Sequence, residues 1–143
     1  MGWTDRRVLV TGAAGVIGRD LVKELVSRGA KVLCVDIVHC DTFGSKDLKC
    51  IQADLARGVP PDVCAFDPEI VFHLAATFER TEEAPGYWMT SFDNNVLLSQ
   101  LLLKPLVPVP SLKAFVFASS YLIYDPKLYL NSLELYHLKE IDP

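Results

Sequence analysis

The chain has 143 residues, half of them hydrophobic, and a formal net charge of −4. This length predicts one domain, residues 1–143, that is large enough to bury a core. The sequence holds no apolar run of the roughly 18–20 residues that a membrane span needs, no signal peptide before Val8 and no basic run, which argues against membrane and nucleic-acid partners.

Strand-like apolar runs alternate with helical patterns along the chain. In chain order, we expect strands at 8–11, 31–36, 49–53, 70–76 and 113–120, helices at 16–28, 62–66 and from 87 or 91 to 103, and polar loops at 39–46 and 77–86. Pro105 is expected to stop the last helix. This alternation predicts an α/β fold, a doubly wound parallel sheet with helices on both faces.

Three glycines, Gly12, Gly15 and Gly18, lie between the first strand and the first helix with the spacing G-x-x-G-x-x-G. In such a turn the first glycine permits the tight bend, the second lets the backbone approach a pyrophosphate, and the third lets the helix pack closely. The helix N-terminus adds unpaired N–H groups and a positive dipole end. The turn therefore predicts the phosphate-binding site of a Rossmann-type sheet, and the alternative is a βα turn without a ligand.

The first helix supports this interpretation through apolar residues at helical spacing and a glycine at its end. These apolar positions are Val16, Ile17, Leu21, Val22, Leu25 and Val26, followed by Gly29.

Asp36 ends the second predicted strand, about 20 residues past the glycines, where dinucleotide folds place the carboxylate that accepts a ribose hydroxyl. A carboxylate also repels a 2′-phosphate, and no arginine follows at 37–39. The expected cofactor is therefore NAD, which is favoured over NADP. The alternative is that Asp36 only caps the strand end.

Ligands of a doubly wound sheet lie across the carboxyl ends of its strands, and three further strand ends meet at this edge. Asp54 can accept a hydrogen bond from an adenine amino group while Leu55 covers the ring; the alternative for Asp54 is a turn cap. Ala75 and Ala76 leave room for a ligand, or for two closely packed elements. The last strand ends in two serines.

The four cysteines lack C-x-x-C spacing, and the three histidines lie far apart in the sequence. Neither a disulfide framework nor a metal site is supported by this spacing. We expect free thiols in a reducing, cytoplasmic environment, no metal, and structural histidines.

Four motifs resemble those of a known family. Residues 11–18 (TGAAGVIG) resemble the T-G-x-x-G-x-x-G fingerprint of extended short-chain dehydrogenases/reductases, and residues 73–76 (HLAA) are similar to its H-x-A-A strand. Asn95 matches an asparagine of its central helix, and Ser119-Ser120 with Tyr124 matches its S-S-x-x-x-Y segment. Within this superfamily the chain most resembles NAD-dependent epimerases/dehydratases, which act mainly on nucleotide sugars.

The resemblance implies roles for individual residues. Ser120 corresponds to the catalytic serine, which orients a substrate hydroxyl or carbonyl, and Asn95 supports the site from the central helix. The alternatives are a helix-surface amide for Asn95 and turn-capping hydroxyls for Ser119 and Ser120. The implied cofactor-binding residues are Gly12, Gly15, Val16, Ile17, Gly18, Asp36, Ile37, Asp54, Leu55, Leu74, Ala75, Ala76, Asn95 and Ser119.

The sequence departs from the family at the general acid/base, the tyrosine of a Y-x-x-x-K motif, which is expected at or past residue 143. Tyr136 and Lys139 have the spacing Y-x-x-K, and Glu140 stands where the lysine belongs. Residues three apart share a helix face, so this pair remains an alternative. We expect the N-terminal, cofactor-binding part of a longer enzyme, truncated before the last strands and the substrate domain.

Two functions are compatible with these observations. The first is the NAD-binding part of an epimerase/dehydratase-type oxidoreductase, in which hydride moves between NAD and a carbon of a nucleotide sugar, and the isolated chain is inactive. The second is a non-catalytic dinucleotide-binding module that senses redox state or acts as a scaffold. In both, the dinucleotide is a partner.

The central helix is apolar nearly all round, which predicts burial on more than one side. The covering surface is either the core of the domain or a second copy in a homodimer. The apolar residues are Val96, Leu97, Leu98, Leu101 and Leu102.

Overall fold

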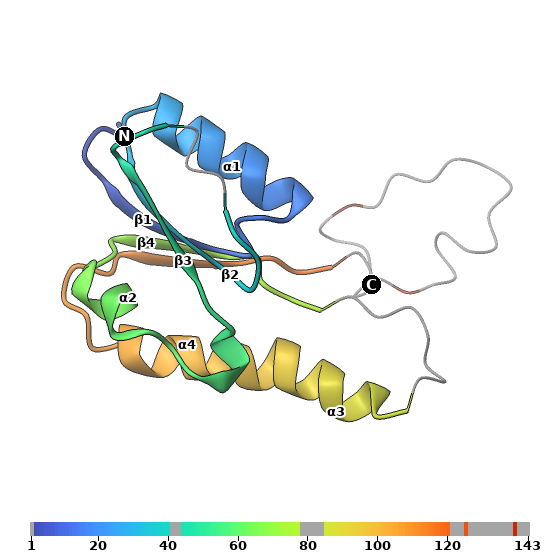
Figure 1. The fold of residues 1–143 in the computed structure, drawn as a ribbon. Coiled ribbons are helices and arrows are strands. Elements are labelled where there is room, and N and C mark those ends of the chain that lie inside the picture. Colours follow the sequence, from blue (N-terminus) through green and yellow to red (C-terminus); the bar gives the residue numbers. More distant parts are fainter. Residues whose placement is uncertain (1, 41–43, 78–84, 121–124, 126–138, 140–143) are drawn as a thin grey trace, which may run out of the picture.

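A computed structural model describes residues 2–40, 44–77, 85–120, 125 and 139. Strands and helices alternate along the chain, as the sequence predicts (Figure 1). The strands are β1 (Arg7–Thr11), β2 (Lys31–Asp36), β3 (Leu48–Gln52), β4 (Ile70–His73) and β5 (Ala114–Phe117). The helices are α1 (Val16–Ser27), α2 (Pro61–Ala65), α3 (Tyr87–Ser91) and α4 (Leu98–Leu106), with a 3₁₀ turn η1 (Leu55–Arg57) and a π-helical segment η2 (Phe92–Leu97).

The five strands form one parallel sheet in the order β3-β2-β1-β4-β5, which confirms the predicted doubly wound topology. β1 lies at its centre, where Val8 pairs with Val32 of β2 on one side and Ile70 of β4 on the other. The strand order reverses between β1 and β4, and such a reversal leaves a crevice at the carboxyl ends of the strands.

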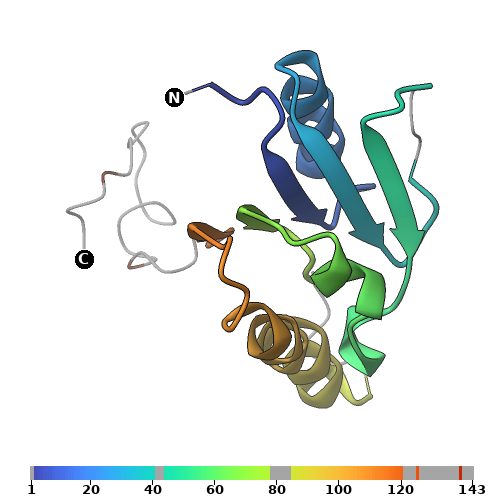
Figure 2. The same ribbon diagram turned by 90° about the vertical axis from the view of Figure 1, so that its left-hand side faces the viewer.

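Helices cover both faces of the sheet, α1 on one and α2 and α4 on the other (Figure 2). Because side chains of a strand alternate between faces, Val8 and Val10 of β1 pack with Val22 of α1, while Leu9 packs with Leu102 of α4. Two separate core layers therefore hold the sheet between its helices.

The first turn of α1 is exposed, although its residues continue the apolar pattern of the helix. Val16 and Ile17 are 86% and 71% exposed. The first turn lies next to the carboxyl end of β1, where the sheet no longer continues beneath it. Burial on this helix therefore begins at Gly18 and continues at Val22 and Leu25.

Two strands are shorter than predicted. β4 ends at His73 and β5 at Phe117, whereas the apolar runs suggested strands to 76 and 120. The ladder stops because β1 ends at Thr11, the partner of His73, and His73 is in turn the partner of Phe117. The apolar residues after His73 are thereby released from the sheet and become available to line a site.

The central helix continues past Pro105, which was expected to stop it. Proline removes one backbone N–H, and so one hydrogen bond, in the last turn of α4. Leu102 and Leu106 are fully buried there, and their packing keeps the last turn helical. Within the described ranges, every helix falls short of the length and apolarity that a membrane crossing requires.

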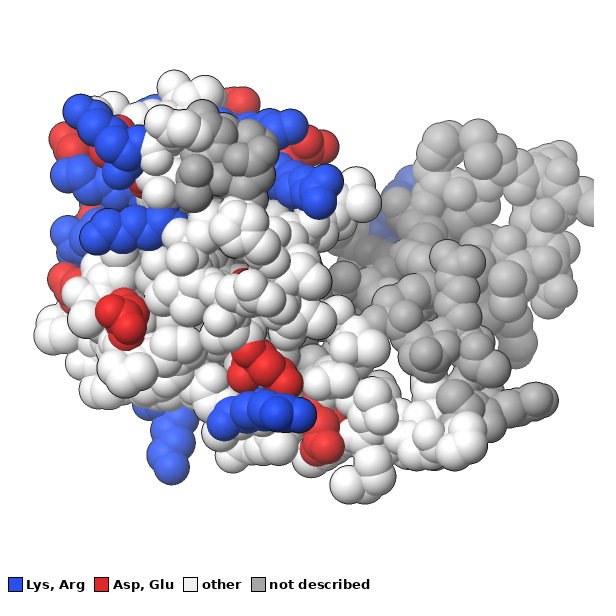
Figure 3. Space-filling model, in the orientation of Figure 1, with Lys and Arg blue, Asp and Glu red and all other residues white. Residues whose placement is uncertain are grey.

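Ion pairs join the amino ends of β1, β4 and β5. The Glu69 carboxylate, 8% exposed as a residue, accepts hydrogen bonds from Lys113 Nζ at 2.6 Å and Arg6 Nη1 at 2.5 Å. Arg7 Nη2 pairs with Asp67 Oδ2 at 2.9 Å. The bonds from Lys113 and Arg6 lower the pKa of Glu69 to about 2. Figure 3 shows charges of both signs at this end of the sheet, at the left of the view.

Candidate functional site

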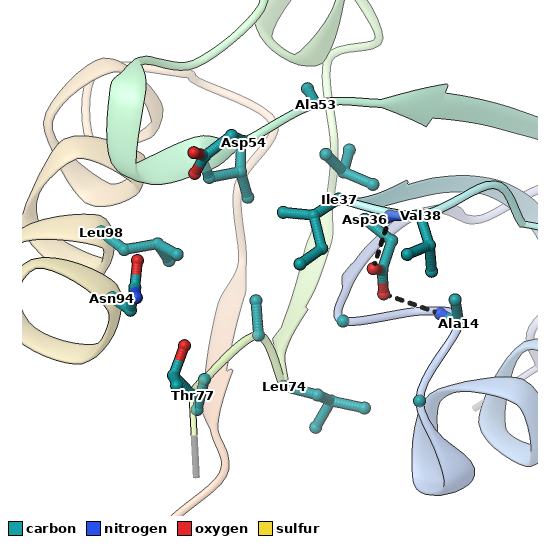
Figure 4. A pocket seen from close by; sticks show the side chains of 16 residues that line it. Ala14, Asp36, Ile37, Val38, Ala53, Asp54, Leu74, Thr77, Asn94 and Leu98 are labelled. Atoms are coloured by element: carbon teal, nitrogen blue, oxygen red, sulfur yellow. Dashed lines mark hydrogen bonds between the residues drawn. The ribbon is translucent and has the colours of Figure 1, made fainter. Parts of the chain in front are cut away.

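A pocket of about 500 Å³ opens at the carboxyl ends of the strands, next to the reversal of strand order (Figure 4). Its volume is in the range of small-molecule sites. The structure brings many of the predicted cofactor-binding residues together around it: Gly12, Gly15, Asp36, Ile37, Asp54, Leu55, Leu74, Ala75 and Ala76.

Gly12 fills a position that no other residue fits. Its φ is +69°, and a Cβ there would lie 2.7 Å from both the nitrogen of Ala75 and the carbonyl carbon of Leu74. The turn after β1 thus passes directly beneath the backbone that leaves β4. Gly18 is similarly constrained, because a Cβ would overlap the carbonyl oxygen of Gly12, so it packs α1 against the loop itself.

Gly15 is less tightly packed than the other two glycines. It is the N-cap of α1, its φ of −68° suits any residue, and a Cβ would approach only the Gly12 oxygen, at 3.2 Å. No side chain of the described residues caps the helix. The N–H groups of the first turn and the positive end of the helix dipole therefore remain available to an anion, and phosphate is the anion that such a helix end commonly binds.

Asp36 ties β2 to the glycine loop. Its Oδ2 accepts a hydrogen bond from the backbone N–H of Ala14 at 2.9 Å, and its Oδ1 accepts one from Val38 at 3.2 Å (Figure 4). The capping role considered from the sequence is therefore real. It does not exhaust the carboxylate, because each oxygen has a further lone pair that can accept a hydrogen bond from a ribose hydroxyl.

Asp54 caps the turn η1, which is the alternative role that its position in the sequence suggested. Its Oδ1 accepts a hydrogen bond from Ala56 at 3.0 Å, and its Oδ2 pairs with Arg57 at 3.2 Å. The same carboxylate borders the pocket beside Leu55, a core residue that is only 2% exposed. Together they form the wall of the pocket on the β3 side.

Asn95 lies behind the pocket wall, and its neighbour Asn94 lines the pocket. The Asn95 side chain clamps one residue of the wall at two points: Oδ1 accepts from the Thr77 N–H at 2.8 Å and Nδ2 donates to the Thr77 carbonyl at 3.1 Å. The Asn95 amide is therefore bound to the backbone of Thr77 and does not simply face solvent.

Ser119 and Ser120 follow β5 at the same edge of the sheet, and both are exposed. They do not line the pocket, and neither do Val16, Ile17 or Gly18. The tyrosines at 124 and 136 and the glutamate at 140 lie outside the described residues.

His73 is a structural residue. It is 1% exposed, its Nδ1 lies 2.7 Å from Thr11 Oγ1, and its Nε2 lies 2.9 Å from Ser99 Oγ. Burial lowers its pKa, which favours the neutral imidazole.

Some pocket residues were not predicted. Ala14, Val35, Val38 and Ala53 adjoin predicted residues, so extending each strand end by one or two positions would have found most of them. Asn94 and Leu98 are one helical turn apart on the central helix. To predict them, one must know which side of the central helix faces the pocket. The sequence does not show this, because the helix is apolar on almost every side.

Comparison with known proteins agrees with this geometry. The model of the NAD-dependent epimerase/dehydratase family matches residues 8–137. The chain belongs to this family. A UDP-glucose 4-epimerase of Caenorhabditis elegans is 33% identical over 140 residues, and a probable dTDP-glucose 4,6-dehydratase of Sinorhizobium fredii is 30% identical over 127 residues. The epimerase match covers 83% of this chain and the dehydratase match 67%.

Solved structures of similar proteins share the fold. MoeE5 in complex with UDP-glucose and NAD superposes with a TM-score of 0.68 at 36% identity, over 83% of this chain and 38% of MoeE5. A UDP-galactose 4-epimerase gives a TM-score of 0.66 at 30% identity, over 82% and 39% of the two chains. This chain spans 39% of the length of the nematode epimerase and 36% of that of the dehydratase.

Proposed function

We propose that this chain binds NAD in the pocket and is the cofactor-binding part of a longer epimerase or dehydratase. The observation that carries the proposal is the meeting, at one strand edge, of the uncapped N-terminus of α1, the close-packed turn at Gly12 and the Asp36 carboxylate. An anion-binding helix end beside a ribose acceptor is the chemistry that a dinucleotide requires. The NAD-bound structure of a relative that is 36% identical supports the same assignment.

Each part of the pocket then has a role. The first turn of α1, including Gly15 and the exposed Val16 and Ile17, faces the pyrophosphate. Asp36 accepts the adenosine ribose hydroxyls, and Asp54 and Leu55 border the adenine. The carboxylate of Asp36 disfavours a 2′-phosphate, which supports NAD over NADP.

The chemistry of the whole protein follows from the cofactor and the position of the serines. Bound NAD would supply reversible hydride transfer at a carbon of a nucleotide sugar. Ser120 is placed after β5, at the same edge as the pocket, and would hold the substrate oxygen by hydrogen bonding.

A kinetic experiment on the protein that contains this chain tests the catalytic part. With UDP-glucose or dTDP-glucose and NAD, we expect turnover that a Ser120→Ala variant lowers about 100-fold or more, the typical contribution of a positioned hydrogen-bonding group, while NAD affinity changes less than twofold. Tight NAD binding without turnover on any nucleotide sugar would instead support the non-catalytic module.

We also propose that the helix formed by α3 and η2 contributes to a homodimer. Trp88, Met89, Phe92 and Val96 are each at least half exposed and recur at helical spacing. Figure 3 shows this part of the surface, at the lower right, without charged side chains along α3. Analytical ultracentrifugation should show a dimer that Phe92→Glu dissociates, and a monomer at all concentrations would contradict the proposal.

The cysteines support a cytoplasmic location for the same protein. Among the described residues, no disulfide joins Cys34, Cys40, Cys50 or Cys64, and Cys34 and Cys40 are buried. Burial raises the pKa of Cys40 to about 12, so its thiol stays protonated and slow to oxidise. Cysteines without disulfides are typical of proteins in a reducing compartment.

A further inference from the structure

A chain of hydrogen bonds with a defined direction runs beneath the pocket, from the central helix to β1. Ser99 Oγ donates its one proton to the Asn95 carbonyl at 2.6 Å, so it can only accept from His73 Nε2, 2.9 Å away. His73 Nδ1 then carries a lone pair and accepts from Thr11 Oγ1 at 2.7 Å. The Thr11 oxygen in turn accepts a hydrogen bond from the N–H of Ala75 at 3.3 Å.

The series of hydrogen bonds through Ser99, His73 and Thr11 holds one end of a stretch of backbone, and the Asn95 side chain holds the other end. Residues 75–77 have left the ladder of β4, so side chains must satisfy their backbone groups. Thr11 holds the N–H of Ala75, and Asn95 holds both backbone groups of Thr77. We call these three residues, Ala75, Ala76 and Thr77, the β4 wall.

The central helix is shaped to join the two supports. The π-helical segment η2 carries Asn95, and Ser99 follows one turn later, at the start of α4. Single π-turns within helices are rare and frequently occur at functional sites. Ser99 and Asn95 thus belong to one polar row of the helix, which connects the clamp to His73.

The middle of this series of hydrogen bonds, between Thr11 and His73, is deeply buried, and its two ends at Ser99 and Ala75 are half-buried. Thr11 is 0% and His73 1% exposed, and the rings of Phe115 and Phe117 lie 5.8 and 5.7 Å from the imidazole, centre to centre. A buried polar network is costly unless every member is satisfied, and when satisfied it specifies one geometry. An aliphatic core would fill this space equally well without fixing the backbone of the wall.

We propose that Thr11, His73 and Ser99 are positioning residues, which fix the β4 wall against the nicotinamide half of the bound dinucleotide. This rests on the proposed binding of NAD. The adenosine half is assigned to Asp36 on β2 and to the β3 side, so the other half extends from the glycine turn towards β4. The wall is therefore in contact with NAD but contributes little to the binding of AMP.

The test compares Thr11→Val and Ser99→Ala with a matched control, Ser27→Ala. Ser27 Oγ also donates to a carbonyl of its own helix, that of Glu24 at 2.8 Å, but on the exposed side of α1. For the 143-residue chain, calorimetry measures NAD and AMP affinity, and NMR measures the exchange of the Ala75 and Thr77 amides without ligand. Loss of one buried hydrogen bond should weaken NAD about five- to tenfold, speed amide exchange about tenfold and leave AMP within twofold.

Other outcomes separate the possible failures. Unchanged exchange at both amides, or an equal loss of NAD and AMP affinity, would overturn the positioning role. If the unmodified protein binds no NAD, the proposed function fails. The amide exchange rates then still decide whether the hydrogen bonds through Thr11, His73 and Ser99 fix the β4 wall. Should Thr11→Val not fold, Thr11→Ser replaces it as the test variant: it retains the hydroxyl and must keep the slow exchange of the Ala75 amide. In addition, the ¹⁵N shifts of His73 must report a neutral ring that is protonated at Nε2.

Discussion

The two ends of the parallel sheet are built from different chemistry. At the amino ends, full charges pair with one another: Glu69 with Arg6 and Lys113, and Arg7 with Asp67. At the carboxyl ends, the Asp54 carboxylate also pairs with a cation, Arg57, but the hydrogen bonds that the described residues make to Asp36 come from the backbone N–H groups of Ala14 and Val38. The carboxylates of Glu69 and Asp67 are thus paired with cations, whereas Asp36 borders the pocket without a cation among its described hydrogen-bond partners.

This contrast separates stability from function along the strands. The same five strands connect both ends. At the amino ends, the carboxylates of Glu69 and Asp67 are paired with arginine and lysine side chains. At the carboxyl ends, an uncapped helix and a carboxylate with spare lone pairs border a pocket instead. Changes at the first end should alter the free energy of unfolding, and changes at the second should alter binding.

The largest expected effect comes from the glycine turn. Gly18→Ala would place a Cβ on the Gly12 carbonyl oxygen, which we expect to lower the free energy of unfolding by about 2–4 kcal/mol because backbone must move. Gly15→Ala keeps a permissive φ, and its Cβ would meet only the Gly12 oxygen, at 3.2 Å, so its stability should change by less than about 1 kcal/mol while NAD affinity falls more than tenfold. Urea unfolding and calorimetry measure the two quantities, and equal behaviour of the two variants would contradict this division.

At the opposite end, the expected effect depends on pH. The pKa of Glu69 is about 2 in the folded protein against an ordinary 4.5, so its pairing stabilises fully above pH 4.5 and is lost as the pH falls towards 2. The difference in urea midpoint between the unmodified chain and Glu69→Gln should therefore be large at pH 7 and shrink steadily below pH 4.5. NAD affinity at pH 7 should be the same in both. A midpoint difference that is independent of pH would show that the ion pairs do not stabilise the fold.

The sequence allowed the topology and most strand boundaries to be predicted, because buried parallel strands are continuous apolar runs and the glycine turn separates the first strand from the first helix. It did not show where β4 ends, since Leu74, Ala75 and Ala76 are as apolar as the strand itself. Their release depends on where the partner strand turns, at Gly12, and that is a tertiary effect.

Gly12, Gly15 and Asp36 could be located from the sequence, because a glycine-rich turn and a carboxylate at the next strand end are recognisable without the fold. The structure brings these three residues to one pocket. Asn94 and Leu98 were missed because their contribution depends on the rotation of a helix that includes a π-turn. Asn95 and His73 were noted in the sequence, but only the three-dimensional contacts show that both hold other groups in place.

The assignment of the pocket to NAD is tested by a calorimetric titration of the chain with NAD⁺ and NADP⁺, beside an Asp36→Ala variant. We predict that NAD⁺ binds at least about tenfold more tightly than NADP⁺, and that the variant binds NAD⁺ more weakly and loses the preference, since one charge-assisted hydrogen bond contributes roughly that factor. Equal affinity for the two cofactors in the unmodified chain, or no binding of either, would contradict the assignment.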